Sequence, residues 1–191
     1  MFWRRISPEW IEGKWKAGWA LDSHSKCINK SGVKRTYLGE LIYQIKYQGK
    51  KRYIPKVSRI IVKFLKTRYV LPYISVILPV PPTNYDREFQ PVFEIVNEVG
   101  RLLKIPADVE YIVKVKDTPQ IKNIHDKELR RNILKNAFEV SDLRYKGRKV
   151  LLLDDIFDSG ATLEVITELL YNDAQVDNVY VLAITRTRKN E

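Results

Sequence analysis

The sequence predicts an α/β protein: a parallel central sheet with helices on both faces, preceded by a small basic hood at the N-terminus. Three short apolar runs, over residues 74–80, 150–153 and 179–184, are separated by segments whose apolar residues recur at helical spacing. Strands that are apolar throughout are typical of a parallel sheet covered on both sides. The length of 191 residues is enough to bury such a core and favours one main domain.

The positive charge of the chain is concentrated near its N-terminus. Residues 1–70 hold 17 lysines and arginines against 4 acidic residues, whereas residues 71–191 hold 17 against 19. All four tryptophans, at positions 3, 10, 15 and 19, also lie in the first part. We therefore expect a basic, tryptophan-containing hood over residues 1–70 and an α/β core over residues 71–191.

The first part is predicted to contain a strand and two helices. Residues 14–21 partly alternate between apolar and polar side chains, which predicts a strand or hairpin. The apolar side chains expected on one face are Trp15, Ala17, Trp19 and Leu21. Apolar residues then recur at helical spacing over 38–45 and 57–65, with Gly49 between the two helices. Pro55 suits the first turn of the second helix.

The second part is predicted to alternate strands and helices. The expected strands cover residues 74–80, 111–115, 150–153 and 179–184. One helix is expected to begin at Pro91 and to end near Pro106, and another to cover residues 163–170. The stretch over residues 116–137 is polar, charged and only partly helical in pattern.

The segment from Val150 to Thr162 carries the most information about function. An apolar strand is followed by the adjacent carboxylates Asp154 and Asp155, then by a short loop with a glycine and the start of a helix. The loop consists of Asp158, Ser159, Gly160, Ala161 and Thr162. Ligands of open α/β sheets bind at the carboxyl ends of strands. Backbone N–H groups at a helix N-terminus, helped here by two hydroxyl groups, favour a phosphate.

The two carboxylates repel an anion, so they suit sugar hydroxyl groups or a hydrated Mg²⁺ beside the phosphate. Hydroxyl groups at one end and a phosphate at the other describe a sugar phosphate. Two acids after a strand also occur at other kinds of site, and Asp158 or Ser159 could cap the helix with no ligand at all. The Gly-Lys-Ser/Thr loop of a nucleotide hydrolase does not occur in the sequence.

The whole segment resembles the phosphoribosyl-pyrophosphate (PRPP) motif of type I phosphoribosyltransferases, and within that group the chain is similar to the ComF-like competence family. The likeness covers most of residues 36–188. It includes the helix that ends in Lys46-Tyr47, Leu78-Pro79-Val80-Pro81 followed by Arg87-Glu88-Phe89-Gln90, Thr118-Pro119-Gln120, Arg131-Asn132 and Ala137-Phe138. The family loop usually begins Thr-Thr-Gly, where this chain has Asp158-Ser159-Gly160. The four-cysteine zinc module that often opens the family is missing.

The resemblance implies the type I phosphoribosyltransferase fold and a Mg²⁺-dependent enzyme. Such an enzyme transfers ribose 5-phosphate from PRPP to a nitrogenous base or other nitrogen acceptor. Asp154 and Asp155 would hold the two ribose hydroxyl groups, and residues 158–162 would bind the 5′-phosphate. Mg²⁺ would be bound through the substrate and could also contact the two carboxylates.

The same resemblance implies groups that act on the leaving pyrophosphate. Arg87 would lie near it, and residues 116–131 would close over the site as a lid. Lys116 or Arg131 would then stabilise the departing group. Asp158 could face the acceptor base and handle its proton, or it could only cap the helix.

A second class of function stays open: a PRPP- or nucleotide-sensing binding protein in DNA uptake or nucleic-acid handling, without turnover. Residues 1–70 could bind single-stranded DNA through base stacking and phosphate contacts. In the competing interpretation, Trp15 and Trp19 belong to the core, and the lysines form a solvated face that steers the anionic substrate.

His24 and Cys27 have the spacing of two metal ligands, but two ligands do not make a structural zinc site, so a surface turn is the better interpretation. The single cysteine excludes an internal disulfide. No apolar run approaches the ~20 residues that span a bilayer. The first residues also lack the pattern of a signal peptide. We therefore expect no membrane span and a cytoplasmic location.

Overall fold

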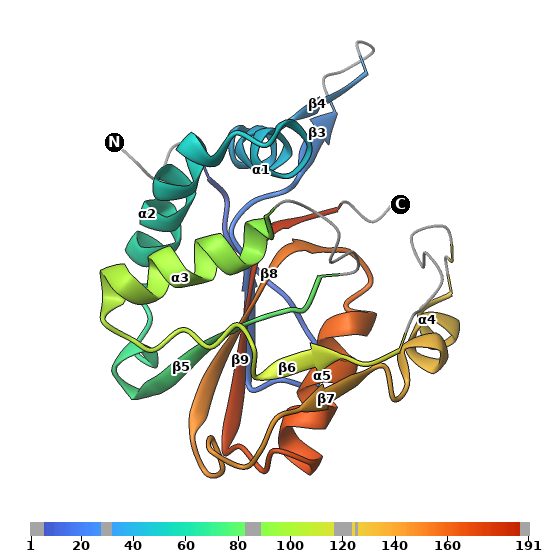
Figure 1. The fold of residues 1–191 in the computed structure, drawn as a ribbon. Helices are drawn as coiled ribbons and strands as arrows, with labels where there is room; N and C mark the ends of the chain where they lie inside the picture. The colour runs from blue at the N-terminus through green and yellow to red at the C-terminus, as the bar shows by residue number, and fades with distance from the viewer. Residues whose placement is uncertain (1–5, 28–31, 83–88, 117–123, 125, 188–191) are drawn as a thin grey trace.

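The main sheet of the protein has five strands in the order β1-β2-β9-β8-β5 (Figure 1). The computed structural model describes residues 6–27, 32–82, 89–116, 124 and 126–187. The strands are β1 (Glu9–Trp10), β2 (Ala17–Ala20), β5 (Ile74–Pro79), β8 (Lys149–Phe157) and β9 (Asn178–Arg186). Neighbouring strands from β2 to β5 pair in parallel, whereas β1 pairs antiparallel with β2. The predicted parallel sheet is therefore confirmed.

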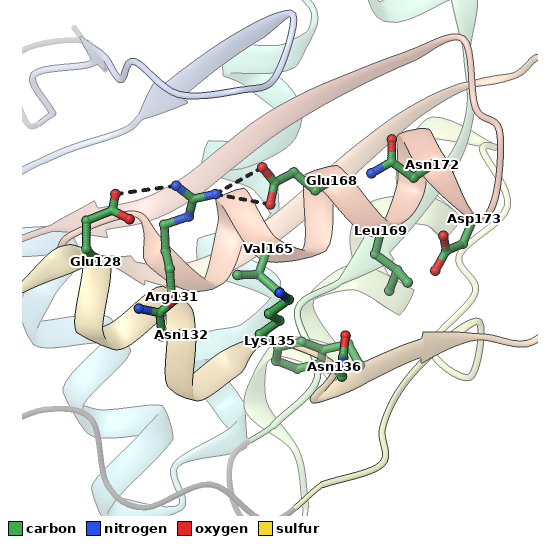
Figure 2. Close-up of a pocket in the computed structure, with 11 residues that line it drawn as sticks. Glu128, Arg131, Asn132, Lys135, Asn136, Val165, Glu168, Leu169, Asn172 and Asp173 are labelled. Atoms are coloured by element: carbon green, nitrogen blue, oxygen red, sulfur yellow. Dashed lines mark hydrogen bonds and ion pairs between the residues drawn. The ribbon is translucent and has the colours of Figure 1, made fainter.

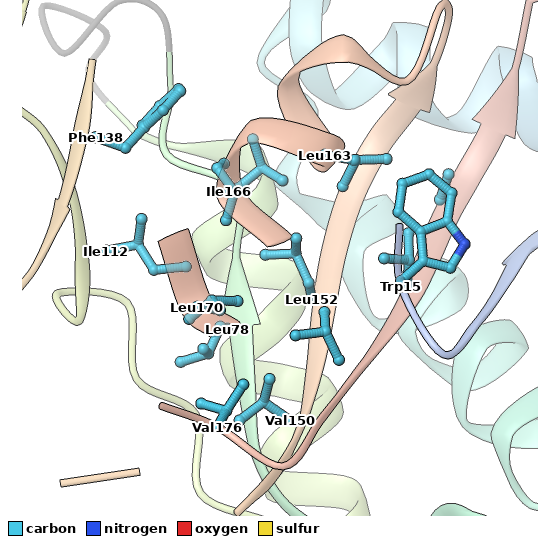
Figure 3. Packing of buried hydrophobic residues seen from close by; sticks show 14 of the residues in the cluster. Trp15, Leu78, Ile112, Phe138, Val150, Leu152, Leu163, Ile166, Leu170 and Val176 are labelled. Atoms are coloured by element: carbon cyan, nitrogen blue, oxygen red, sulfur yellow. The ribbon is translucent and has the colours of Figure 1, made fainter. Parts of the chain in front are cut away.

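Helices cover both faces of this sheet, as predicted. α1 (Tyr37–Gln48), α2 (Ile54–Leu65) and α3 (Pro91–Leu103) lie on one side, and α5 (Ala161–Asn172) lies on the other. The side chains of β8 alternate between two cores, because successive residues of a strand point to opposite faces. Leu151 and Leu153 belong to the core under α1–α3. Val150 and Leu152 belong to the core under α5 (Figure 3). This alternation explains why the strand is apolar on both faces.

Smaller elements flank the sheet. β3 (Ser25–Cys27) and β4 (Val33–Arg35) form an antiparallel pair, as do β6 (Ile112–Lys114) and β7 (Phe138–Val140). The predicted strand at 111–115 therefore belongs to a separate two-stranded sheet. The partly helical stretch contains α4 (Lys127–Leu134), which packs on α5. In the described ranges, the helices are too short or too polar to cross a bilayer.

The predicted N-terminal hood is not confirmed as a separate part. β2 pairs with β9 from Ala17 opposite Tyr180 to Ala20 opposite Ala183, so it extends the central sheet. The buried residues of α1 and α2 share one core with residues of α3, β8 and β9. The described residues of the first 70 therefore belong to the same folded body as the rest.

Trp15 does not share a face with Trp19, contrary to the prediction. Trp19 lies in the core under α1–α3, whereas Trp15 lies in the core under α5 and contacts Phe157 edge to face. The reason is that β2 begins only at Ala17, so strand alternation does not extend back to Trp15. Its indole ring folds over Gly18, where there is no room for a Cβ. Its Nε1 donates to the carbonyl oxygen of Ile11 at 3.0 Å.

Candidate functional site

The two carboxylates lie within β8 rather than after it, because the strand continues beside β9 as far as Phe157. The prediction that the strand ends before the acids is therefore wrong. Alternation along the strand places Asp155 on the face covered by α1 and Asp154 on the opposite face. The backbone N–H of Asp155 donates to Oδ1 of Asp154 at 2.8 Å. The acids are adjacent, but they do not point in the same direction.

Asp155 is almost fully buried and has a cationic partner that the sequence analysis did not propose. Nζ of Lys46, in the last turn of α1, lies 2.5 Å from Oδ2 of Asp155. Burial disfavours the charged ammonium group, but the Asp155 carboxylate outweighs this effect and the pKa of Lys46 is raised. On the backbone side, Thr185 donates its hydroxyl to the Asp155 carbonyl oxygen at 3.1 Å.

Asp154 is held in an environment that favours its neutral form. Burial, and secondly the neighbouring Asp155 carboxylate, raise its pKa from 3.8 to about 7, although Lys46 and two backbone N–H groups act in the opposite direction. A carboxyl group with this pKa changes charge near neutral pH. It can therefore accept a hydrogen bond from a sugar hydroxyl when it is ionised.

The raised pKa of Asp154 predicts a pH-dependent stability. Between pH 3.8 and about 7, the folded protein holds a proton at Asp154 that the unfolded chain has released. The free energy of unfolding is therefore expected to fall as pH rises through this range. Urea unfolding across it should show a weaker pH dependence in Asp154→Asn than in the wild type. An equal slope in both proteins would contradict the assignment.

The loop after β8 turns sharply into α5. Gly160 has φ of +80° and ψ of −2°, a left-handed conformation that glycine adopts without strain. It is the N-cap residue of α5 and, as a glycine, provides no side-chain cap of its own. The Ser159 hydroxyl instead accepts the Ala161 N–H at 3.3 Å. The positive end of the helix dipole therefore faces the loop at Ser159 and Gly160.

Asp158 binds side chains of α4 and of the segment after β9. One of its oxygens accepts from the guanidinium of Arg130, and the other accepts from the Thr187 hydroxyl at 2.6 Å. Arg130, which is buried, also donates to the Ser159 hydroxyl at 3.0 Å and to the carbonyl oxygen of Ile124. A fixed cation from α4 thus lies against the loop.

Sequence reasoning missed Lys46 as a site residue, and it included Arg130 only among the cations of the lid over residues 116–131. Arg130 lies four residues before Leu134 on α4, and both side chains are buried, so the face that they share packs against the protein. This spacing of four residues from a buried leucine is a signal that could have distinguished Arg130 from Arg131. Lys46 gave no such signal, because its partner Asp155 lies 109 residues away in the chain.

The other predicted residues lie elsewhere. Arg131 binds Glu168 of α5 at 3.0 and 3.2 Å and lies 3.7 Å from Glu164, beside a cavity of about 400 Å³ between α4 and α5 (Figure 2). Lys116 is exposed beyond the end of β6. Arg87 lies outside the described residues. The structure therefore brings together the two acids, the 158–162 loop, Lys46 and Arg130.

The carboxylate pair does not fit a resident metal ion. The described residues contain no group of three or more His, Cys, Asp or Glu side chains that could hold one. His24 and Cys27 are among the described residues, so neither belongs to a group of this kind within them. One oxygen of Asp155 is bound by Lys46, and one oxygen of Asp154 accepts a backbone N–H.

The fold and the position of the site define the class of protein. It is an α/β protein whose candidate site lies where the parallel strand β8 turns into α5. No protein-family model matches the chain. Over 157 residues the chain is 29% identical to Competence protein F of Haemophilus influenzae, covering 78% of this chain and 68% of that protein. This similarity confirms the resemblance to the ComF-like competence family that the sequence indicates.

Solved structures also match the chain. A hypothetical protein from Neisseria gonorrhoeae with bound ppGpp is 15% identical, with a TM-score of 0.46 and coverage of 73% of this chain and 70% of that one. A hypoxanthine phosphoribosyltransferase of Staphylococcus aureus is 12% identical (TM-score 0.40; 73% and 76% coverage). A purine phosphoribosyltransferase of Pyrococcus horikoshii is 18% identical (TM-score 0.42; 72% and 85% coverage). Because these TM-scores are below 0.5, the assignment of the fold class does not use these structures. It rests on the strand order described above.

Proposed function

We propose that the protein binds PRPP and transfers its ribose 5-phosphate to a nitrogenous acceptor. The observation that carries this proposal is the turn from β8 into α5. There, the left-handed Gly160 is the N-cap of α5, the neighbouring Ser159 hydroxyl accepts the first N–H of the helix, and the turn lies a few residues after Asp154. The similarity to Competence protein F supports the resemblance to the ComF-like family, from which the expected roles of these residues come.

The loop would bind the 5′-phosphate through backbone N–H groups at the start of α5. These groups and the helix dipole favour an anion, and the hydroxyl groups of Ser159 and Thr162 add donors. Arg130, which already donates to Ser159, adds a positive charge beside the phosphate. The ribose hydroxyl groups would donate to Asp154, whose carboxylate lies outside the Lys46–Asp155 ion pair.

The reaction would break the bond between C1 of ribose and the pyrophosphate oxygen as the acceptor nitrogen attacks C1. The sugar becomes oxocarbenium-like, and negative charge develops on the departing pyrophosphate, so preorganised cations lower the barrier. Arg87 and Lys116 are the cations proposed to stabilise this negative charge. Arg131 could do so only after breaking its ion pairs with Glu164 and Glu168. Mg²⁺ would arrive with the pyrophosphate of the substrate. Asp158 is the proposed group facing the acceptor base.

The proposal predicts that carboxylate substitutions remove PRPP binding. Asp154→Asn combined with Asp155→Asn is expected to abolish the calorimetric signal of PRPP, because neutral amides cannot accept the ribose hydroxyl groups as strongly. Asp173→Asn, at an exposed position after α5, is the matched control and should bind as the wild type does. Unchanged affinity in the double variant would refute the site. A second assay measures release of pyrophosphate from PRPP in the presence of each of a panel of nucleobases. Release indicates an enzyme, whereas PRPP binding without release indicates a binding protein.

A second candidate function is binding of single-stranded DNA in a competence role without turnover. Trp15 and Trp19 are buried and cannot stack on bases, but Trp10 and Tyr69 are exposed, Tyr69 to 98%. Exposed basic residues cluster on and before α2: Lys51, Arg52, Lys56, Arg59, Lys63 and Lys66. Exposed aromatic rings beside a basic helix face are the features that single-strand binding uses.

This candidate predicts a steep salt dependence. The logarithm of the affinity for an oligothymidine should fall with the logarithm of salt concentration by roughly 0.7 per phosphate contacted. Lys56→Glu with Arg59→Glu should reduce both the affinity and the slope. Lys146→Glu, an exposed position outside residues 1–70, is the control. A flat salt response, or no binding at low salt, would exclude DNA binding by this surface.

A further inference from the structure

The Lys46–Asp155 ion pair lies at the centre of the candidate site. The Nζ to Oδ2 distance is 2.5 Å, and the side chains are only 18% and 11% exposed. Lys46 also lies close enough to Asp154 to lower its pKa. The ammonium group therefore acts on both carboxylates of the motif.

Both partners of this pair are held in place by the fold. Lys46 follows Ile45, which is fully buried in the core under α1–α3. Asp155 lies near the C-terminal end of β8, which pairs with β9 as far as Phe157, and the buried Thr185 of β9 donates to its carbonyl oxygen. Moving Lys46 away from Asp155 would require α1 to shift on the sheet or would leave a buried carboxylate without a counter-ion.

The pair leaves the candidate site with little charge for a divalent cation. Mg²⁺ and Mn²⁺ are bound by charged oxygen ligands. Asp155 is already neutralised by Lys46, and one oxygen of Asp154 already accepts the backbone N–H of Asp155. An ammonium group 2.5 Å from Asp155 also repels a second cation from the same oxygen.

We propose that Lys46 occupies the position at Asp155 that a metal ion would otherwise take, so that the free protein binds no divalent cation at its carboxylate pair. This inference rests on the proposed phosphoribosyl site and refines it: Asp154 contacts the sugar, Asp155 is the fixed anion that holds Lys46, and any metal enters with the pyrophosphate. Lys46 is a positioning residue, since it acts through the two carboxylates.

The test is binding of Mn²⁺ alone, followed by electron paramagnetic resonance at neutral pH. The wild type is expected to show no site tighter than millimolar. Lys46→Met should gain one site per chain that is at least about tenfold tighter, because the Asp155 carboxylate is then released from its ion pair. Adding Asp155→Asn to Lys46→Met should remove that site. Lys66→Met, the loss of an exposed lysine just after α2, should behave as the wild type.

Two results would overturn the proposal. One is a wild-type protein that binds Mn²⁺ more tightly than millimolar and loses it on Asp155→Asn. The other is a folded Lys46→Met that binds Mn²⁺ no better than the wild type. If Lys46→Met does not fold, Lys46→Gln keeps a hydrogen-bond donor without the charge and must show the same gain. Because PRPP is absent from the assay, failure of PRPP binding would refute the proposed function without changing this result.

Discussion

Gly160→Val is expected to abolish binding of both ribose 5-phosphate and PRPP. Gly160 has φ of +80°, a conformation that a β-branched residue adopts only with strain of about 1–3 kcal/mol. A Cβ at this position would lie 3.0 and 3.2 Å from two ring atoms of Phe157, closer than normal packing permits. To relieve that contact, either the Phe157 ring or the turn that presents the backbone N–H groups must move by a few tenths of an ångström, and the strain at positive φ adds to the displacement of the turn. Calorimetric titration with ribose 5-phosphate measures the loss.

The matched control for Gly160→Val is Gly147→Val. Gly147 also has positive φ, +67°, but a Cβ there would meet no atom of the described residues within 4 Å. This control variant carries the backbone strain without a steric contact in the candidate site. It should lose stability and keep its affinity for ribose 5-phosphate. Retained binding in a folded Gly160→Val would contradict the proposed phosphate position.

Lys46→Met is expected to be the most destabilising charge substitution at the candidate site. It leaves the Asp155 carboxylate buried beside Asp154 without its counter-ion. Removal of one partner from a buried pair costs about 3–5 kcal/mol, which is a large part of the stability of a typical domain. The free energy of unfolding from urea titrations at neutral pH measures this cost.

A double-mutant cycle separates the charge from the packing of the Lys46 side chain. Lys46→Met with Asp155→Asn should be more stable than Lys46→Met alone, because the uncompensated carboxylate is gone. Lys66→Met should stay within about 0.5 kcal/mol of the wild type. A double variant whose loss equals the sum of the two single losses would show that the pair is not coupled.

The helices and the parallel strands could be predicted because their signals are local. The spacing of Leu38, Leu41, Ile42 and Ile45 predicts α1, and the left-handed Gly49 ends it, as expected of a glycine at this position. The apolar run before Asp154 predicts a buried strand, and the Asp158–Thr162 loop does lead into a helix. Each of these predictions needs only neighbours in the chain.

The errors have both distant and local causes. β8 extends beyond the acids because β9 pairs with it as far as Arg186, a partner that the run 150–153 does not reveal. Trp15 changes faces because its ring closes over Gly18 rather than continuing a strand. Arg130 and Arg131 are adjacent on α4, so the choice between them depends on the direction in which each side chain leaves the helix. The structure places Arg130 on the loop and Arg131 on the glutamates of α5.

The most direct test of the central claim is an amide NMR titration of the wild-type protein with ribose 5-phosphate. If the phosphate is bound where β8 turns into α5, the largest shifts will be those of the backbone N–H groups of residues 159–162. Ala161 should lead them, since it begins the helix. Shifts confined to the cavity beside Arg131, or no shifts at saturating ligand, would contradict the claim.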